Sequence, residues 1–223
     1  MKTNLMAILA LSIFLLSCSR SEDTIEETTQ ETPFFNLKVG NEWVYKTYDR
    51  QDFTSELKFN GKIDTLKIVE EVSLNNKKYA KVRHSYKDNP NQNQNYEYWR
   101  LNNKGHLVSL SSYHFNQGTS SDNLEIVKHT GKDFDYSYTD LTFSNYGNIT
   151  YKLYPDTSIS INNQAYTVSP YNGHFIPNAQ NPHLISKVVE NNYKEGLGLV
   201  KSVCHSVTGT YNFEEHLISY SLK

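Results

Sequence analysis

The sequence has few cysteines, no excess of basic residues and no apolar run long enough to cross a bilayer. Two cysteines, Cys18 and Cys204, are too few for a disulfide scaffold. The 22 basic and 24 acidic residues give a net charge of −2, which excludes the basic surface that nucleic-acid binders use. Ten glycines and six prolines in 223 residues exclude a collagen-like or low-complexity protein. The chain is instead rich in aromatics, with 17 Tyr, 10 Phe and 2 Trp, and this composition argues for a folded core.

The first 17 residues have the pattern of a signal peptide. Lys2 precedes an apolar run of about 12 residues that ends at Leu16 and is too short to span a bilayer. Residues 15–18 read LLSC, which resembles the lipobox of bacterial lipoproteins. The resemblance implies cleavage before Cys18 and lipidation of that residue, which makes the membrane a partner through several acyl chains. An ordinary secretory signal followed by a chance cysteine is the alternative.

Residues 18–33 are expected to form a lipidated cysteine on a flexible acidic tether. Ile25 is the only sizeable apolar residue after Cys18, so the segment cannot bury enough surface to order itself. Residues 21–23, Ser-Glu-Asp, resemble the acidic export signal that sends lipoproteins of the Bacteroidota to the cell surface. A plain acidic spacer is the alternative, so we expect an outer-membrane anchor with both the periplasmic and the surface face open. No linker divides residues 34–223, which are predicted to form a single domain.

Period-two alternation of apolar and polar residues dominates the rest of the chain and indicates strands. Residues 66, 68, 72 and 74 are apolar and share one face, which Glu70 interrupts. Ala80 and Val82 share a face with His84 and Tyr86. The predicted strands are 42–50, 55–60, 63–74, 77–87, 95–101, 106–115, 123–129, 134–143, 148–154, 157–161, 164–169, 184–194, 197–206 and 209–221.

Asparagine pairs separate several of these strands. Asn75-Asn76, Asn162-Asn163 and residues 102–105 are expected to form tight turns, because asparagine tolerates the positive φ that hairpins require. So many short antiparallel strands cannot lie in one flat sheet. We therefore predict an all-β fold of about 10–14 strands in a strongly curved antiparallel sheet, barrel-like or a sandwich, with little helix outside the signal peptide.

Two short blocks resemble a broad, largely uncharacterised group of Bacteroidota outer-membrane lipoproteins. The first is Gly-Asn-x-Trp-x-Tyr, with Gly40, Asn41, Trp43 and Tyr45 as the matching residues. The second lies at residues 193–201 and reads YKEGLGLVK, an aromatic followed by Gly-x-Gly-x-Val. The resemblance implies a secreted, lipid-anchored β domain and no particular activity.

The residues of these two blocks are expected to have structural roles. Trp43 and Tyr45 lie two residues apart on a strand, so they share a face and are expected in the core. Gly196 and Gly198 indicate a bulge, a bend or the close approach of a large side chain such as Trp43.

The sequence contains no recognisable catalytic or metal-binding motif. It has no Gly-x-Ser-x-Gly elbow, no Ser-x-x-Lys and no His-Glu-x-x-His. Cys204 and His205 are adjacent, but neighbours on a strand point to opposite faces. His174 and His183 bracket a proline-rich segment where they could meet. We therefore predict no enzyme activity, no metal site and no cofactor.

The best candidate for a ligand site is residues 170–183, which hold three of the six prolines and are expected to form the longest irregular loop. Tyr171, His174 and Phe175 are the expected binding residues, with a glycan, a peptide or an envelope protein as partner and no role for nucleic acid. The expected function is a non-enzymatic ligand-binding or interaction role at the cell envelope. Two alternatives stay open: a carrier or chaperone for a lipid or apolar ligand in a curved β-sheet cavity, and a hydrolase with a dispersed site.

Overall fold

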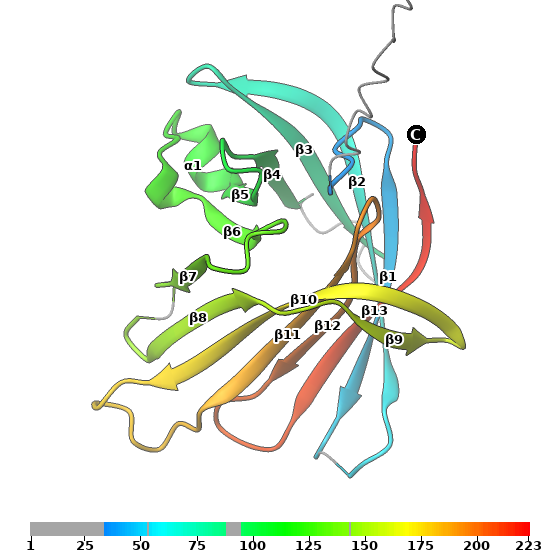
Figure 1. Cartoon of the computed structure of the whole chain (residues 1–223), viewed down its shortest axis with the longest axis vertical. Coiled ribbons are helices and arrows are strands. Elements are labelled where there is room, and N and C mark those ends of the chain that lie inside the picture. The colour runs from blue at the N-terminus through cyan, green and yellow to red at the C-terminus, as the bar shows by residue number, and fades with distance from the viewer. Residues whose placement is uncertain (1–33, 53, 88–94, 143) are drawn as a thin grey trace, which may run out of the picture. The chain divides into compact units, whose positions relative to one another are not determined.

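The computed structural model describes residues 34–52, 54–87, 95–142 and 144–223 (Figure 1). The predicted signal peptide, Cys18 and the acidic tether lie outside the described residues. The elements are β1 (Glu42–Arg50), β2 (Lys58–Leu74), β3 (Lys77–Tyr86), β4 (Asn95–Leu101), β5 (Leu107–Ser111), α1 (Ser112–Asn116), a 3-10 turn (Asp122–Leu124), β6 (Ile126–His129), β7 (Ser137–Asp140), β8 (Gly147–Leu153), β9 (Thr157–Ile161), β10 (Gln164–Pro177), β11 (Lys187–Lys194), β12 (Gly198–His205) and β13 (Asn212–Ser221). Within these ranges no helix has the length and apolarity needed to cross a membrane.

In the described part of the chain, thirteen strands form one strongly curved antiparallel sheet (Figure 1). The strand order is β6-β5-β4-β3-β2-β1-β13-β12-β11-β10-β8-β7, and β9 pairs with β10 off this path. The two edge strands, β6 and β7, follow each other in the chain, and the curved sheet is nearly closed. The predicted all-β, barrel-like fold is therefore confirmed.

The asparagine turns are where the sequence predicts them. Asn75 and Asn76 have φ angles of 50° and 62° between β2 and β3, and Asn162 and Asn163 have 50° and 66° between β9 and β10. These left-handed conformations suit two-residue hairpins, whose twist matches that of the flanking strands. Gly105 supplies a φ of 77° in the turn before β5.

A β-bulge explains why Glu70 interrupts the apolar face of β2. The pairing of β2 with β3 shifts between Ile68 and Glu70, which adds one residue to β2 and resets its alternation. Glu70 is thereby exposed and lies 3.2 Å from the Nζ of Lys81 on the neighbouring strand. The segments predicted as separate strands, 55–60 and 63–74, are one strand of 17 residues.

Three predicted strands are too long. The strand predicted over 106–115 ends at Ser111, whose hydroxyl caps the short helix α1 by accepting a hydrogen bond from the N–H of His114. The segment 123–129 begins as a 3-10 turn, and 134–143 is a strand only over the four residues of β7. Each error falls at a strand end, where short local hydrogen bonds compete with the sheet.

The prediction of a loop over residues 170–183 is wrong for its first half, because β10 continues to Pro177. Residues 164–168 of β10 pair with β9, whereas Tyr171 onward pairs with β8. Pro170 lies between the segment of β10 that pairs with β9 and the segment that pairs with β8. The N–H that proline lacks is therefore not needed for either pairing. The carbonyl of Pro170 accepts a hydrogen bond of 2.8 Å from the N–H of Tyr154.

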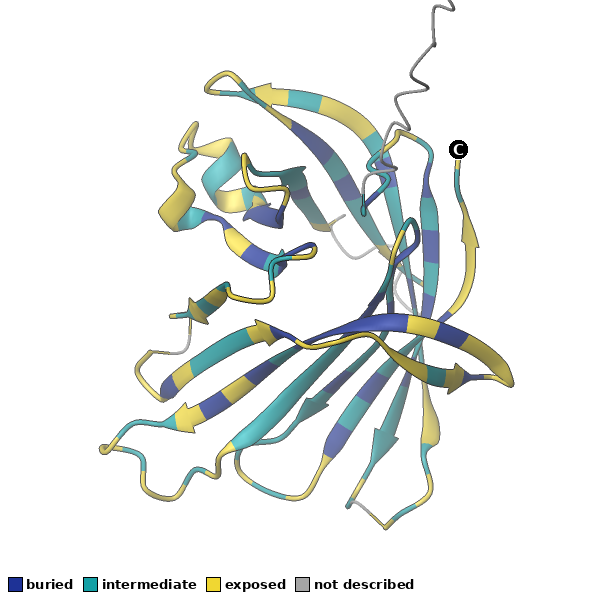
Figure 2. Cartoon of the chain, in the orientation of Figure 1, coloured by how far each residue is buried: buried dark blue, intermediate teal, exposed yellow. Residues whose placement is uncertain are grey.

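Buried residues alternate with partly exposed ones along β1 and over the first residues of β12 and β13 (Figure 2). Trp43 is 5% exposed and Tyr45 is also buried, which confirms the predicted core position of both. Asn41 is fully buried, donates to the carbonyl of Asn36 at 2.8 Å and accepts from the N–H of Lys223 at 2.8 Å. This single amide therefore ties the segment before β1 to the C-terminus.

Candidate functional site

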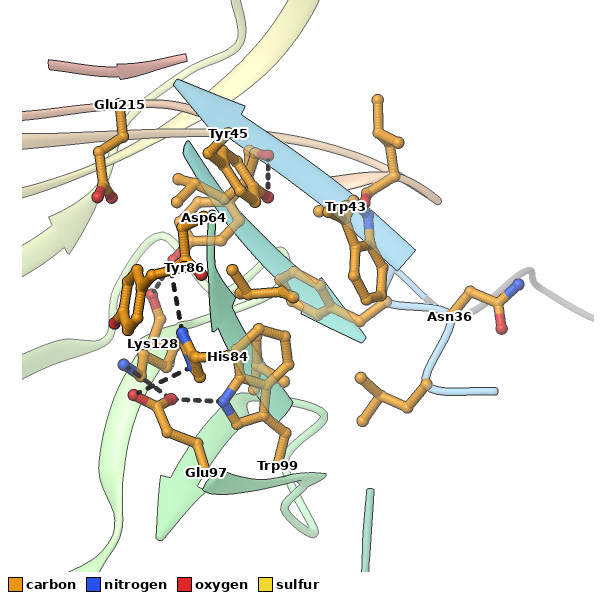
Figure 3. A pocket seen from close by; sticks show the side chains of 18 of the residues that line it. Asn36, Trp43, Tyr45, Asp64, His84, Tyr86, Glu97, Trp99, Lys128 and Glu215 are labelled. Carbon is orange, nitrogen blue, oxygen red and sulfur yellow. Dashed lines mark hydrogen bonds and ion pairs between the residues drawn. The ribbon is translucent and has the colours of Figure 1, made fainter. Parts of the chain in front are cut away.

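The structure has a cavity of about 300 Å³, and Figure 3 shows the side chains of most of its lining residues. Strands β1, β2, β3 and β4 supply about half of its lining residues. The segment before β1, the start of β12 with the residue before it, and single residues of β5, β6, β11 and β13 supply the rest. Its lining is Phe35, Asn36, Leu37, Trp43, Tyr45, Lys62, Asp64, Leu66, His84, Tyr86, Glu97, Trp99, Leu107, Lys128, Tyr193, Leu197, Gly198, Leu199 and Glu215. The volume is at the lower end of the range of about 300–1,000 Å³ for small-molecule sites.

One part of the cavity is apolar and is built around two tryptophans. The rings of Trp43 and Trp99 lie 6.4 Å apart at 45° to each other. Trp43 donates from Nε1 to the carbonyl of Leu197 at 2.7 Å, and Trp99 donates from Nε1 to Glu97 at 2.7 Å. Because both indole N–H groups are bonded within the protein, what the tryptophans present to the cavity is apolar ring surface.

The other part of the cavity is charged. Three carboxylates, Asp64, Glu97 and Glu215, lie with Lys62, His84 and Lys128 on five different strands. His84 Nδ1 lies 3.2 Å from Asp64 Oδ2, and His84 Nε2 lies 4.0 Å from Glu97 Oε1. The histidine therefore bridges two carboxylates, as the dashed lines in Figure 3 show.

Glu97 is held in its ionised form. Burial alone would raise its pKa, but the ammonium of Lys128 at 3.3 Å and the hydrogen bonds from Trp99 and Ser109 outweigh this, helped by His84. Together they lower the pKa of Glu97 to about 2.

The pKa of Glu215 is shifted in the opposite direction, above its ordinary value. Burial raises the pKa of Glu215, and the nearby negative charge of Asp64 adds to that effect, while Lys62 opposes it. The Nζ of Lys62 lies 3.9 Å from Glu215 Oε1, a distance too long for a hydrogen bond.

Asp64 carries a buried polar atom without a hydrogen-bond partner in the described part of the chain, as His84 does at Nε2. Its side chain is 10% exposed, and its Oδ2 faces His84. Its other oxygen, Oδ1, is buried and has no hydrogen-bond partner among the described residues. A buried carboxylate oxygen without a donor is costly, which makes this atom the natural contact for a donor group on a ligand.

The arrangement does not include the parts of a nucleophilic enzyme. The lining residues contain no serine, threonine or cysteine that His84 could activate. Across the described ranges, no group of three or more His, Cys, Asp or Glu side chains is placed to hold a metal ion. What the cavity can do chemically is hold a small molecule that has both an apolar body and hydrogen-bond donors.

The residues that the sequence predicts as a ligand site are not brought together on one surface. Tyr171 and Phe175 are buried, whereas His174 is exposed and lies 3.1 Å from the hydroxyl of Tyr154 through its Nε2. Tyr171 stacks on Tyr151 at 5.3 Å inside the core. None of the three lines the cavity. Their ligand-binding role stays a prediction from the sequence.

The other residues considered as candidates in the sequence lie on β12 or in the segment between β10 and β11. Cys204 and His205 are neighbours on β12, where successive side chains point to opposite faces, and Cys204 is a half-buried free thiol. Burial raises the pKa of the Cys204 thiol. His183 is exposed in the segment between β10 and β11.

The charged residues of the cavity were not predicted as a site from the sequence, although a signal for them exists, and Trp43 and Tyr45 were predicted as core residues only. His84 and Tyr86 continue the apolar face of Ala80 and Val82, and Asp64 continues the face of Leu66 and Ile68. Polar residues that extend an apolar face indicate a place where that face leaves the packed core and borders a cavity.

No protein family and no curated protein matches this chain. Two crystal structures of bacterial proteins are similar to it. A candidate exported protein with a YmcC-like fold from Bacteroides fragilis NCTC 9343 has 11% identity and a TM-score of 0.49, over 85% of this chain and 99% of that chain. A candidate lipoprotein from Parabacteroides distasonis ATCC 8503 has 13% identity and a TM-score of 0.44, over the same shares of the two chains. Identity and TM-score at these levels support no assignment of function.

Proposed function

We propose that this chain is a lipid-anchored cell-envelope protein that binds a small amphipathic ligand in the cavity, without catalysing a reaction. The observation that carries the proposal is the juxtaposition of two tryptophan rings with the buried, unpartnered Oδ1 of Asp64 in one cavity. The lipobox-like residues 15–18 and the acidic segment after Cys18 support the anchor.

The composition of the cavity favours an amphipathic ligand. Leu37, Leu66 and Leu199 continue the apolar surface that the two tryptophans begin, while the carboxylates lie beyond it. A ligand whose apolar body covers these side chains and whose polar group reaches Asp64 satisfies both parts at once.

The size of the cavity distinguishes this proposal from a lipid carrier. About 300 Å³ suits one short chain or a small ring system. The two acyl chains of a phospholipid need more room, so a carrier of whole lipids would require the sheet to open.

A hydrolase is the second candidate, and one observation favours it. His84 lies between Asp64 and Glu97 in a cleft, and such a cluster of titratable groups is typical of active sites. The missing hydroxyl or thiol nucleophile beside His84 weighs against an acyl-transfer mechanism.

The proposal is tested with N-phenyl-1-naphthylamine, a neutral apolar probe whose fluorescence rises in apolar sites. The protein is the mature chain, residues 18–223, with Cys18→Ser so that it stays unacylated. We expect saturable, 1:1 binding that Leu37→Trp weakens at least tenfold, because Leu37 lines the cavity and a larger side chain fills it.

Val39→Trp is the matched control. Val39 lies on the same short segment, is 47% exposed and does not line the cavity, so binding should stay within twofold of the parent. Equal binding by the parent and Leu37→Trp, or no saturable binding at all, would overturn the proposal. Turnover of an ester or glycoside that Asp64→Asn abolishes would favour the hydrolase.

A further inference from the structure

The charges of the cavity can be assigned to partners one by one. Glu97 has four: Lys128, Trp99 and Ser109 at Oε2, and His84 at 4.0 Å from Oε1. The other two carboxylates of the cavity have fewer hydrogen-bond and ion-pair partners. Asp64 Oδ2 contacts His84, and Asp64 Oδ1 has no hydrogen-bond partner in the described part of the chain. The Nζ of Lys62 lies 3.9 Å from Glu215 Oε1. Of the carboxylate oxygens that line the cavity, Asp64 Oδ1 is therefore the one that is buried without a hydrogen-bond partner among the described residues.

Asp64 and Glu215 lie on the two strands that flank β1 in the sheet, and both line the cavity. Tyr45 is paired with Asp64 on β2 and with Leu217 on β13, two residues beyond Glu215. The negative charge of Asp64 is felt at Glu215, and burial together with that charge keeps the pKa of Glu215 raised. A further cation close to Glu215 would favour its ionised form.

Two aromatic rings stand next to Asp64. Tyr45 and Tyr86 are its direct cross-strand partners on β1 and β3, and both line the cavity (Figure 3). Directly paired residues on one face of a sheet have Cβ atoms about 4.5–5.5 Å apart, so the two rings flank the carboxylate. A carboxylate flanked by aromatic rings is the arrangement that recognises ammonium groups, because the ring faces attract the cation as well.

Among the described residues, no lysine or arginine forms an ion pair with Asp64. Lys128 is engaged with Glu97, and the Nζ of Lys62 lies 3.9 Å from Glu215 Oε1 and 5.0 Å above the ring of Tyr86, with its side chain 44% exposed. His84 reaches Asp64 through Oδ2 and leaves Oδ1 free.

We infer that the polar group of the ligand is an ammonium, held by Asp64 Oδ1 beside the ring of Tyr45 and favoured by the nearby charge of Glu215, with its apolar body on Trp43 and Trp99. This inference rests on the proposed function and names its ligand class: a small amine with one apolar chain or ring system. A neutral alcohol would satisfy Asp64 but leave the two carboxylates repelling each other, and a carboxylic acid would add a third negative charge.

Three probes with the same chain and different heads test this: n-octylamine, n-octanol and n-octanoate. Their binding to the mature chain with Cys18→Ser is measured by titration calorimetry at pH 7 and by displacement of N-phenyl-1-naphthylamine. We expect n-octylamine to bind at least tenfold more tightly than n-octanol, and n-octanoate more weakly than either.

Asp64→Asn should remove the preference for the amine and leave n-octanol binding within threefold of the parent. Glu215→Gln, on another strand, should reduce the preference as well, which keeps the test valid if Asp64→Asn does not fold. Glu71→Gln is the matched control, because Glu71 lies on β2 with its side chain 61% exposed and pairs with Lys78 outside the cavity.

The outcomes separate the two proposals. Equal binding of amine and alcohol, or a preference that survives both Asp64→Asn and Glu215→Gln, overturns the ammonium inference and leaves the proposed function standing. If none of the three probes binds while N-phenyl-1-naphthylamine does, the inference fails alone. If N-phenyl-1-naphthylamine does not bind saturably either, the proposed function fails together with the inference.

Discussion

Trp43 donates a hydrogen bond of 2.7 Å from Nε1 to the carbonyl of Leu197, a residue 154 positions further along the chain. Tyr45 makes the same kind of contact from its hydroxyl to the carbonyl of Leu199, at 2.8 Å. The two short sequence blocks at opposite ends of the domain therefore meet in space. Gly196 and Gly198 have φ angles of 74° and 98°, so they shape the turn that presents these carbonyls.

The first prediction concerns Trp43. Trp43→Ala should lower the free energy of unfolding by about 3–5 kcal/mol, because it empties a buried aromatic site. Trp43→Phe keeps most of the ring but removes the N–H, and should cost about 1–3 kcal/mol by leaving the Leu197 carbonyl without this donor. Urea unfolding followed by circular dichroism measures both values.

Tyr220→Ala is the control for this pair. Tyr220 lies opposite Trp43 on β13 but is 50% exposed, so its truncation should change the stability by no more than about 0.5 kcal/mol. A loss below about 1 kcal/mol in Trp43→Ala would contradict the core role of the indole.

The second prediction concerns Gly147, the first residue of β8. A Cβ at this position would collide with the backbone carbonyl of Ile176 and with the ring of Phe175 on the paired strand β10. Since a backbone carbonyl cannot move aside as a flexible side chain can, Gly147→Ala should destabilise the domain by about 1–3 kcal/mol. Thermal unfolding of the purified variant measures the loss.

Gly209→Ala serves as its control, because a Cβ there meets nothing within 4 Å. The control should unfold at the same temperature as the parent. If Gly147→Ala is as stable as Gly209→Ala, the close packing of β8 on β10 is not a constraint.

Much of the fold follows from the sequence because its signals are local. Alternation within one strand, and asparagine pairs at turns, report on neighbours only a few residues apart. The continuation of β10 through Pro170 is not local, because it depends on a change of partner from β9 to β8. A proline within a strand pattern therefore predicted a loop where the tertiary structure accommodates a strand.

The candidate site could be predicted in part for the same reason. The alternation on β3 places His84 on the face of Val82, and this can be read from the sequence. The meeting of Asp64, His84 and Glu215 cannot, because it requires β13 to pair with β1 across most of the chain length. The bulges of β2 and β13 add to the difficulty, since each reverses the face on which the following residues lie.

The third prediction is a pH dependence that involves Glu214. This carboxylate is buried on β13 and lies 2.8 Å from His216 Nε2, 2.7 Å from Lys201 Nζ and 3.6 Å from Arg50. Burial opposes ionisation, but His216 and Lys201 outweigh it and lower the pKa of Glu214 from 4.5 to about 2. A folded-state pKa below the unfolded value stabilises the fold above pH 4.5, and this stabilisation, about 3 kcal/mol, is lost as the pH falls towards 2.

Unfolding curves recorded between pH 7 and pH 2 check this expectation. Glu214→Gln should be less stable than the parent at pH 7 and should show a flatter fall in acid, because its side chain no longer titrates. Glu71→Gln, an exposed carboxylate on β2, should keep the slope of the parent. Identical slopes for the parent and Glu214→Gln would contradict the depressed pKa.

The last prediction concerns the anchor. Cys18→Ala should prevent acylation and leave the protein unanchored, either unprocessed or released, because the sulfur that would carry the lipid is gone. Phase separation in detergent, together with the mass of the mature N-terminus, measures this. Cys204→Ala is the matched control, since Cys204 lies half-buried on β12 and should leave partitioning unchanged. Replacement of residues 21–23 by neutral ones should keep the lipid but reduce protease access on intact cells. A Cys18→Ala protein that partitions with membranes as the parent does would show that the N-terminus is not a lipoprotein signal.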